Sequence, residues 1–112
     1  MFVTELNSEN FDDRIKKGVV IVDIKAEWCS PCKALSPILD QVAGELGDKV
    51  LVGKLDADQN GDLCQRLEVR NIPTLLFYKD GELKERTVGM KQKKEILNIV
   101  NNLLTQEIEP TF

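Results

Sequence analysis

Two cysteines separated by two residues stand in the stretch Glu27–Lys33, which reads Glu-Trp-Cys-Ser-Pro-Cys-Lys. This spacing allows a reversible disulfide when the spacer turns the chain into a helix, and Pro31 suits the first helical position. Cys29 then precedes the first turn, where free N–H groups and the helix dipole stabilise a thiolate. Cys32 falls inside the turn and is more shielded. The pattern predicts thiol–disulfide exchange, with an exposed, reactive Cys29 and a resolving Cys32.

The third cysteine and the absence of histidine limit the alternatives. Half of a zinc site is the other ordinary use of such a pair, but structural zinc takes four ligands. Only Cys64 remains to add one, in a chain of three cysteines and no histidine. Cys-His and Ser-His-Asp catalysis are excluded within the chain for the same reason. Cys64 shares a helical face with Leu63 and Leu67, which favours a buried structural thiol over a site of regulatory oxidation.

Size, composition and charge are those of a single globular domain. The 112 residues are 42% hydrophobic and 30% charged, and the formal net charge of -4 argues against nucleic acid as a partner. No apolar run exceeds four residues, whereas a membrane-spanning helix needs about 20. The first residues lack a basic segment before an apolar one, so they do not predict a secretory signal. The cysteines are few and odd in number, which does not fit a secreted protein held together by disulfides. We expect a cytoplasmic monomer without a membrane span.

Hydrophobic periodicity divides the chain into alternating strands and helices. Strands are expected at residues 2–4, 19–24, 50–55, 74–79 and 82–88, the last two joined by an Asp80-Gly81 hairpin turn. Helices are expected from residue 11 to Gly18, from the cysteine pair to about Gly47 with a kink at Pro37, around 63–67, and at 92–104. Residues 1–104 would form one domain, and residues 105–112 a short frayed tail. The strands at 19–24 and 50–55 and the helix between them form a strand-helix-strand unit, which indicates that the two strands pair in parallel.

An acidic residue interrupts the most apolar strand. Asp23 stands in the run Val-Val-Ile-Val-Asp-Ile, residues 19–24, which is expected to be covered on both faces of a sheet. Burial raises a carboxyl pKa and a neighbouring lysine such as Lys54 lowers it. Asp23 is therefore either a proton-transfer group or an ordinary carboxylate paired with backbone or with Lys54. Lys25 shares the strand face of Asp23, and our hypothesis is that its charge favours the Cys29 thiolate.

Four motifs in order resemble the thioredoxin family over nearly the whole chain, residues 2–104. They are Val22-Asp23 before Ala26-Glu27-Trp28-Cys29-Ser30-Pro31-Cys32-Lys33, then Lys54-Leu55-Asp56-Ala57-Asp58-Gln59-Asn60, then Ile72-Pro73-Thr74, and finally Val88-Gly89. The resemblance implies an α/β thioredoxin fold, a five-stranded mixed β-sheet flanked by four α-helices. It also implies an oxidoreductase that reduces protein disulfides and binds no cofactor beyond its own redox-active disulfide.

The resemblance further implies roles for particular residues. Cys29 would attack the client disulfide as nucleophile, Cys32 would resolve the mixed disulfide, and Asp23, modulated by Lys54, would transfer the proton. Six residues near the cysteines would bind the substrate: Trp28, Ser30, Pro31, Ile72, Pro73 and Gly89. Pro73 corresponds to the family's cis-proline, which faces the cysteines and leaves neighbouring backbone groups free to pair with a substrate strand. Electrons would come from an NADPH- and FAD-dependent thioredoxin reductase and pass to disulfide-containing client proteins.

The chain departs from the family pattern between the cysteines and at the docking rim. Ser30 replaces a usual glycine, and Met90 makes the rim after Gly89 bulkier, so the reduction potential and the choice of clients can differ from those typical of the family. Disulfide oxidases and isomerases share the fold, but they usually carry a histidine between the cysteines, and this chain has none. A non-enzymatic binding subunit with incidental cysteines is the other alternative, and it predicts full function in a Cys29→Ser, Cys32→Ser double variant.

Overall fold

The computed structural model describes residues 3–105. Within this range the strands are β1 (Val3–Leu6), β2 (Val19–Lys25), β3 (Val50–Asp56), β4 (Thr74–Lys79) and β5 (Glu82–Val88). The helices are α1 (Phe11–Arg14), α2 (Ser30–Leu46), α3 (Gly61–Arg66) and α4 (Lys93–Leu104), with a 3-10 turn, Gly47–Lys49, after α2. The expected five strands and four α-helices are all present, and in the expected order.

The strands form one mixed sheet in the order β1-β3-β2-β4-β5. β3 runs parallel to β1 and β2, whereas β4 runs antiparallel to β2 and β5. β2 lies at the centre, and every residue except the last is buried, as a strand covered by helices on both faces requires. The predicted parallel pairing of β2 with β3 is confirmed.

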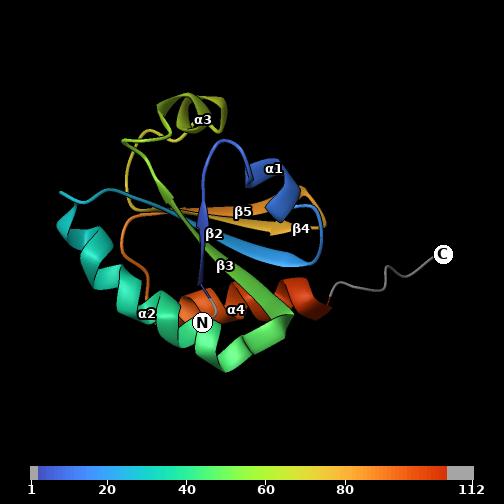
Figure 1. Cartoon of the computed structure of the whole chain (residues 1–112). Coiled ribbons are helices and arrows are strands. Elements are labelled where there is room, and N and C mark those ends of the chain that lie inside the picture. Colours follow the sequence, from blue (N-terminus) through green and yellow to red (C-terminus); the bar gives the residue numbers. More distant parts are fainter. Residues whose placement is uncertain (1–2, 106–112) are drawn as a thin grey trace.

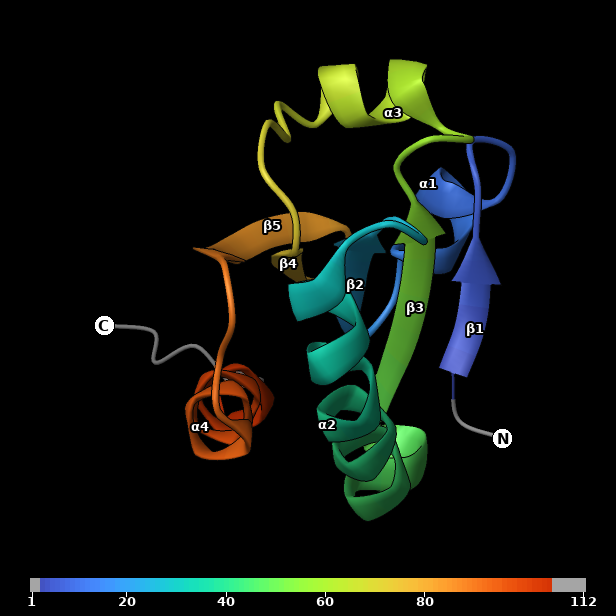
Figure 2. The same ribbon diagram turned by 90° about the vertical axis from the view of Figure 1, so that its left-hand side faces the viewer.

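Helices cover both faces of the sheet, with α2 and α4 on one side and α1 and α3 on the other (Figure 1, Figure 2). Successive residues of β2 face opposite sides of the sheet. Val19 and Ile21 join the core formed with α2 and α4, while Val20 joins the core formed with α1 and α3. The same alternation carries Asp23 and Lys25 to the α2 side, where the cysteine pair also lies.

Two local features position the outer strands β1 and β5. Gly53 of β3 lies beneath Leu6, and a Cβ atom at this position would overlap the Leu6 side chain, so only glycine allows β1 to pack so closely. At the other edge, Asp80 and Gly81 have φ values of 50° and 86°, both in the left-handed region that a tight two-residue hairpin favours. The predicted hairpin between β4 and β5 is confirmed.

The boundaries differ from the expected ones in a few places. β1 extends to Leu6, and residue 2 lies outside the described residues. α1 is a single turn that ends well before Gly18, and α2 continues through Pro37 without interruption, so a kink there stays a prediction. Thr105 caps α4, and the rest of the expected tail, residues 106–112, lies outside the described part. Among residues 3–105, no helix is both long enough and apolar enough to cross a membrane.

Candidate active site

The cysteine pair lies at the N-terminus of α2, at the end of the central strand β2. Cys29 is the N-cap residue of α2, and its Sγ accepts a hydrogen bond from the Cys32 N–H at 3.2 Å. The two cysteines form a disulfide with their Cα atoms 5.2 Å apart. Pro31 is the second helical residue instead of the first, a position whose N–H also lacks an intrahelical partner. The N–H groups and dipole of this helix end therefore favour negative charge on the Cys29 sulfur.

The expected difference in exposure between the two cysteines is wrong for the disulfide form. Cys29 is only 4% exposed and Cys32 is 2% exposed, because Ala26 and Ile72 pack against both. Burial therefore hardly distinguishes the two sulfurs. What distinguishes them is the helix end, where Cys29 receives the Cys32 N–H as its hydrogen-bond donor.

Asp23 is fully buried on β2, on the face that α2 covers. Neither carboxylate oxygen has a hydrogen-bond partner among the described residues, so the alternative of a carboxylate paired with backbone or Lys54 is wrong. Burial raises the pKa of the Asp23 carboxyl from 3.8 to about 6, against the opposing effect of the Lys54 and Lys25 charges. A carboxyl with this pKa can take up or give a proton near neutral pH.

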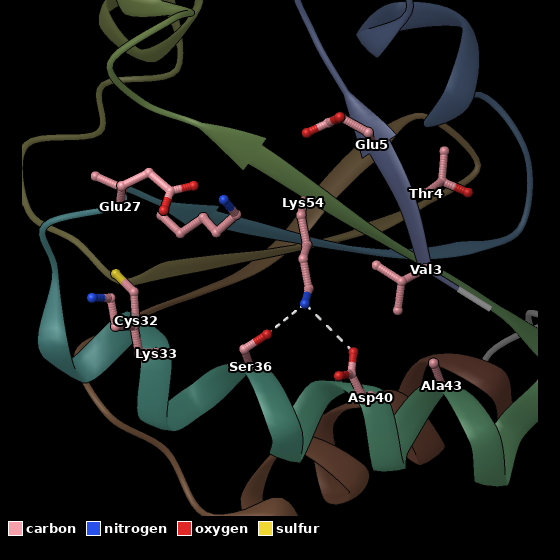
Figure 3. A pocket seen from close by; sticks show the side chains of 12 residues that line it. Val3, Thr4, Glu5, Glu27, Cys32, Lys33, Ser36, Asp40, Ala43 and Lys54 are labelled. Carbon is pink, nitrogen blue, oxygen red and sulfur yellow. Dashed lines mark hydrogen bonds and ion pairs between the residues drawn. The ribbon is translucent and has the colours of Figure 1, made fainter. Parts of the chain in front are cut away.

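Lys54 lies opposite Asp23 in the parallel register of β2 and β3 and points toward α2 (Figure 3). Its Nζ donates to Ser36 Oγ at 2.5 Å and lies 3.4 Å from Asp40 Oδ1. Lys54 thus joins the sheet to α2 and acts on Asp23 through its charge, not through a hydrogen bond. Sequence reasoning missed Ser36 and Asp40; their spacing of four residues on one helix face, beside the buried Leu35 and Leu39, was the available signal.

A cleft of about 800 Å³ opens between α2 and the β1 side of the sheet, next to Cys32. Its lining combines polar and charged groups from β1, β2, β3 and α2 (Figure 3). Lys25, Cys32 and Lys54 all line it. The cleft therefore brings two lysines to the same opening as Cys32.

Trp28 projects beside the disulfide with 69% of its surface exposed. Its Nε1–H donates to Asp58 Oδ2 at 2.9 Å, across thirty positions of the sequence. Trp28 is therefore not a core aromatic. Asp58 was noted only as part of a motif, and no local pattern links it to the tryptophan. The hydrogen bond holds the ring beside the cysteines while leaving it accessible.

The loop before β4 faces the disulfide. The Ile72–Pro73 peptide bond is cis, as expected, and Ile72 packs against the cluster of Ala26 and the two cysteines. The Pro73 carbonyl accepts a hydrogen bond from the Gly89 N–H at 2.8 Å, which ties the loop to the end of β5. No described backbone group outside the regular strands and helices bonds to Ile72.

Cys64 lies on α3, on the opposite side of the sheet from α2. It is a free thiol, 7% exposed, packed in the core that α1 and α3 form with the sheet. Burial, together with the charge of Asp56, raises the pKa of its thiol. The expectation of a buried structural thiol is confirmed. Among the described residues, no group of three or more cysteine, aspartate or glutamate side chains is arranged to hold a metal ion.

A disulfide at a helix N-terminus, on a mixed sheet and above a buried carboxyl of raised pKa, defines a thiol–disulfide exchange protein of the α/β class. Comparisons with known proteins identify the family. The thioredoxin family model matches residues 2–102. A thioredoxin of Chlamydia pneumoniae is 46% identical over 96 residues, covering 86% of this chain and 93% of that protein.

Two further relatives agree. A thioredoxin of Bacillus subtilis is 38% identical over 104 residues, covering 93% of this chain and all of that protein. Among solved structures, a mutant thioredoxin from Halobacterium salinarum superposes with a TM-score of 0.85 at 29% identity, covering 96% of this chain and 94% of the other. The chain belongs to the thioredoxin family. It is a protein-disulfide reductase with a redox-active Cys-x-x-Cys pair, Cys29 and Cys32.

Proposed function

We propose that the chain reduces protein disulfides with Cys29 as the attacking thiolate, Cys32 as the resolving thiol and Asp23 as the proton acceptor. The observation that carries this assignment is the hydrogen bond from the Cys32 N–H to Cys29 Sγ at the N-terminus of α2. This N–H group stabilises negative charge on the Cys29 sulfur and not on the Cys32 sulfur. For this reason we assign the attacking thiolate to Cys29, and Cys32 gives up its proton in the second step.

The reaction transfers two electrons from the dithiol to the client. The Cys29 thiolate attacks one client sulfur, a mixed disulfide forms, and the other client sulfur leaves as a thiolate that takes up a proton. The Cys32 thiol then gives its proton to the Asp23 carboxylate and attacks Cys29 Sγ. The second client sulfur leaves, and the Cys29–Cys32 disulfide closes. Lys54 modulates Asp23 by lowering its pKa, so that more of the carboxyl is charged and ready to accept the proton.

Substrate docking is assigned to the surface around the disulfide. Trp28, held by Asp58, forms one side of it, and the exposed first turn of α2 forms another with Ser30 and Pro31. Ile72 offers its backbone for pairing with an extended client segment. Pro73 and Gly89 support this segment, since their hydrogen bond ties the loop before β4 to the end of β5.

The family membership implies a reductase and client proteins as partners. We assign the return of electrons to an NADPH- and FAD-dependent thioredoxin reductase. Relatives include bacterial thioredoxins such as that of Staphylococcus saprophyticus, 38% identical over 104 residues. We assign the chain to the cytoplasm, because a disulfide reductase works in a compartment that keeps thiols reduced. Few large apolar side chains are exposed among the described residues, namely Trp28, Leu83, Val88 and Met90. This scarcity supports a monomer.

Trapping the mixed disulfide tests these assignments. A Cys32→Ser variant, incubated with a disulfide-containing client such as insulin, should accumulate a covalent complex through Cys29 because the resolving thiol is missing. The matched Cys29→Ser variant should form none, and Cys64→Ser should turn over like the wild type. Accumulation in Cys29→Ser, with none in Cys32→Ser, would reverse the roles of the two cysteines.

A further inference from the structure

Two lysines, one from each central parallel strand, border the buried carboxylate. Lys25 follows Asp23 by two residues on β2 and so lies on the same face of the sheet. Lys54 is the register partner of Asp23 on β3. Both lysines line the cleft into which Cys32 faces. The carboxyl that accepts the proton from Cys32 is therefore flanked by two cations instead of one.

The two lysines are in different electrostatic situations. The Lys54 ammonium is bound to Ser36 and Asp40 (Figure 3), and the negative charge of Asp40 offsets part of its effect. Lys25 has neither a hydrogen bond nor an ion pair to its ammonium within the described range. The register partner of Lys25 on β3 is Asp56, whose carboxylate accepts from the N–H groups of Asp58 and Gln59 and forms no ion pair with Lys25 within the described range.

Burial and nearby charges set the ionisation of Asp23, since its oxygens have no hydrogen-bond donor among residues 3–105. From β2 and β3 the charges of Lys25 and Lys54 lower its pKa, and from α2 the charge of Asp40 raises it. On β4, the register partner of Asp23 is the uncharged Leu75. Other charged residues of the cleft, Glu5, Glu27 and Lys33, are not among the groups that shift this pKa.

We propose that Lys25 is a positioning residue for the resolving step, whose ammonium keeps Asp23 charged and able to take the Cys32 proton under mildly acidic conditions. This inference rests on the proposed role of Asp23 as proton acceptor. Lys25 takes no proton and touches no reacting atom. Acting through Asp23, it affects the resolving step in the pH range in which Asp23 titrates. The hypothesis that Lys25 also favours the Cys29 thiolate concerns the attacking step and stays a separate prediction.

The test separates the two chemical steps by their pH profiles. Reduced protein is mixed with a chromogenic aromatic disulfide, which releases one coloured thiolate when Cys29 attacks and a second when Cys32 resolves. The second phase is followed between about pH 5 and about pH 8 in wild type, Lys25→Met and Lys25→Arg. Lys33→Met is the control, because this lysine lines the same cleft without acting on Asp23.

The expected result is a shift of the second phase. In Lys25→Met the midpoint of its pH profile should move to higher pH, with rates at the acidic end reduced by up to about fivefold, the effect of one nearby charge in a water-like medium. Lys25→Arg and Lys33→Met should keep the wild-type midpoint. In parallel, carbon-13 NMR of the Asp23 carboxyl should show a higher titration midpoint in Lys25→Met.

Two results would overturn the inference, and an Asp23→Asn variant tells them apart. If Lys25→Met keeps the wild-type kinetic and NMR midpoints while Asp23→Asn slows the second phase, Lys25 has no role and Asp23 remains the proton acceptor. If Asp23→Asn leaves the second phase and its pH profile unchanged, the proposed role of Asp23 fails, and the inference fails with it.

Discussion

Replacing Asp23 with asparagine should stabilise the protein at neutral pH. The carboxyl pKa is about 6 in the folded chain against an ordinary value of 3.8, so folding favours the protonated acid. The native state therefore loses stability as the pH rises from about 4 to about 6, and the loss stays constant above that range. Converted at about 1.36 kcal/mol per pH unit, the difference between the two pKa values amounts to about 3 kcal/mol.

Asparagine has nearly the same shape as aspartate and also lacks partners for its polar atoms, so the substitution removes mainly the charge. Urea unfolding of the oxidised protein at a series of pH values measures the effect. Asp23→Asn should match the wild type below about pH 4 and exceed it by about 3 kcal/mol at pH 7. Asp13→Asn, at an exposed position, is the control and should change stability by less than about 0.5 kcal/mol. A difference between Asp23→Asn and wild type that does not vary with pH would refute this reasoning.

Three further predictions concern packing and access. Gly53→Ala should lower the free energy of unfolding by about 1–3 kcal/mol, because the new methyl group overlaps Leu6; unchanged chemical denaturation would contradict the close approach of β1. Asp58→Ala should release Trp28, which a fall in the fluorescence anisotropy of the chain's single tryptophan would report, together with weaker client reduction; an unaltered anisotropy would argue that the hydrogen bond does not hold the ring. In the oxidised native protein, the buried Cys64 thiol should react with an aromatic disulfide much more slowly than after unfolding, and equal rates would contradict its burial.

Much of the fold could be predicted because it is encoded in short patterns. The uninterrupted apolar run of β2 predicts a strand covered on both sides, and all of its residues but Lys25 are buried. The apolar stripe of α4 is buried at Ile96, Val100 and Leu103 as its helical spacing predicts. The Asp80-Gly81 pair encodes its own turn. Each of these features depends on neighbours within a few positions, so no tertiary contact is needed to recognise it.

The parts of the site that were missed depend on contacts between distant residues. Nothing local pairs Trp28 with Asp58, and the partners of Lys54 on α2 follow from how the helix crosses the sheet. The burial of Cys29 was missed for the same reason, because it results from packing by Ile72, far along the chain. The chemistry of the cysteine pair could be predicted from the sequence. The residues that bury the two sulfurs and the charged residues around them could not.

The reduction potential of the Cys29–Cys32 couple tests the central claim most directly. The protein is equilibrated with glutathione buffers of known ratio, and the free thiols are trapped and counted. A reductant of the thioredoxin family should have a potential of about -270 mV, a figure characteristic of thioredoxins in general and not worked out from this structure. A potential above about -200 mV would place the chain among oxidising or isomerising proteins and contradict its assignment as a disulfide reductase.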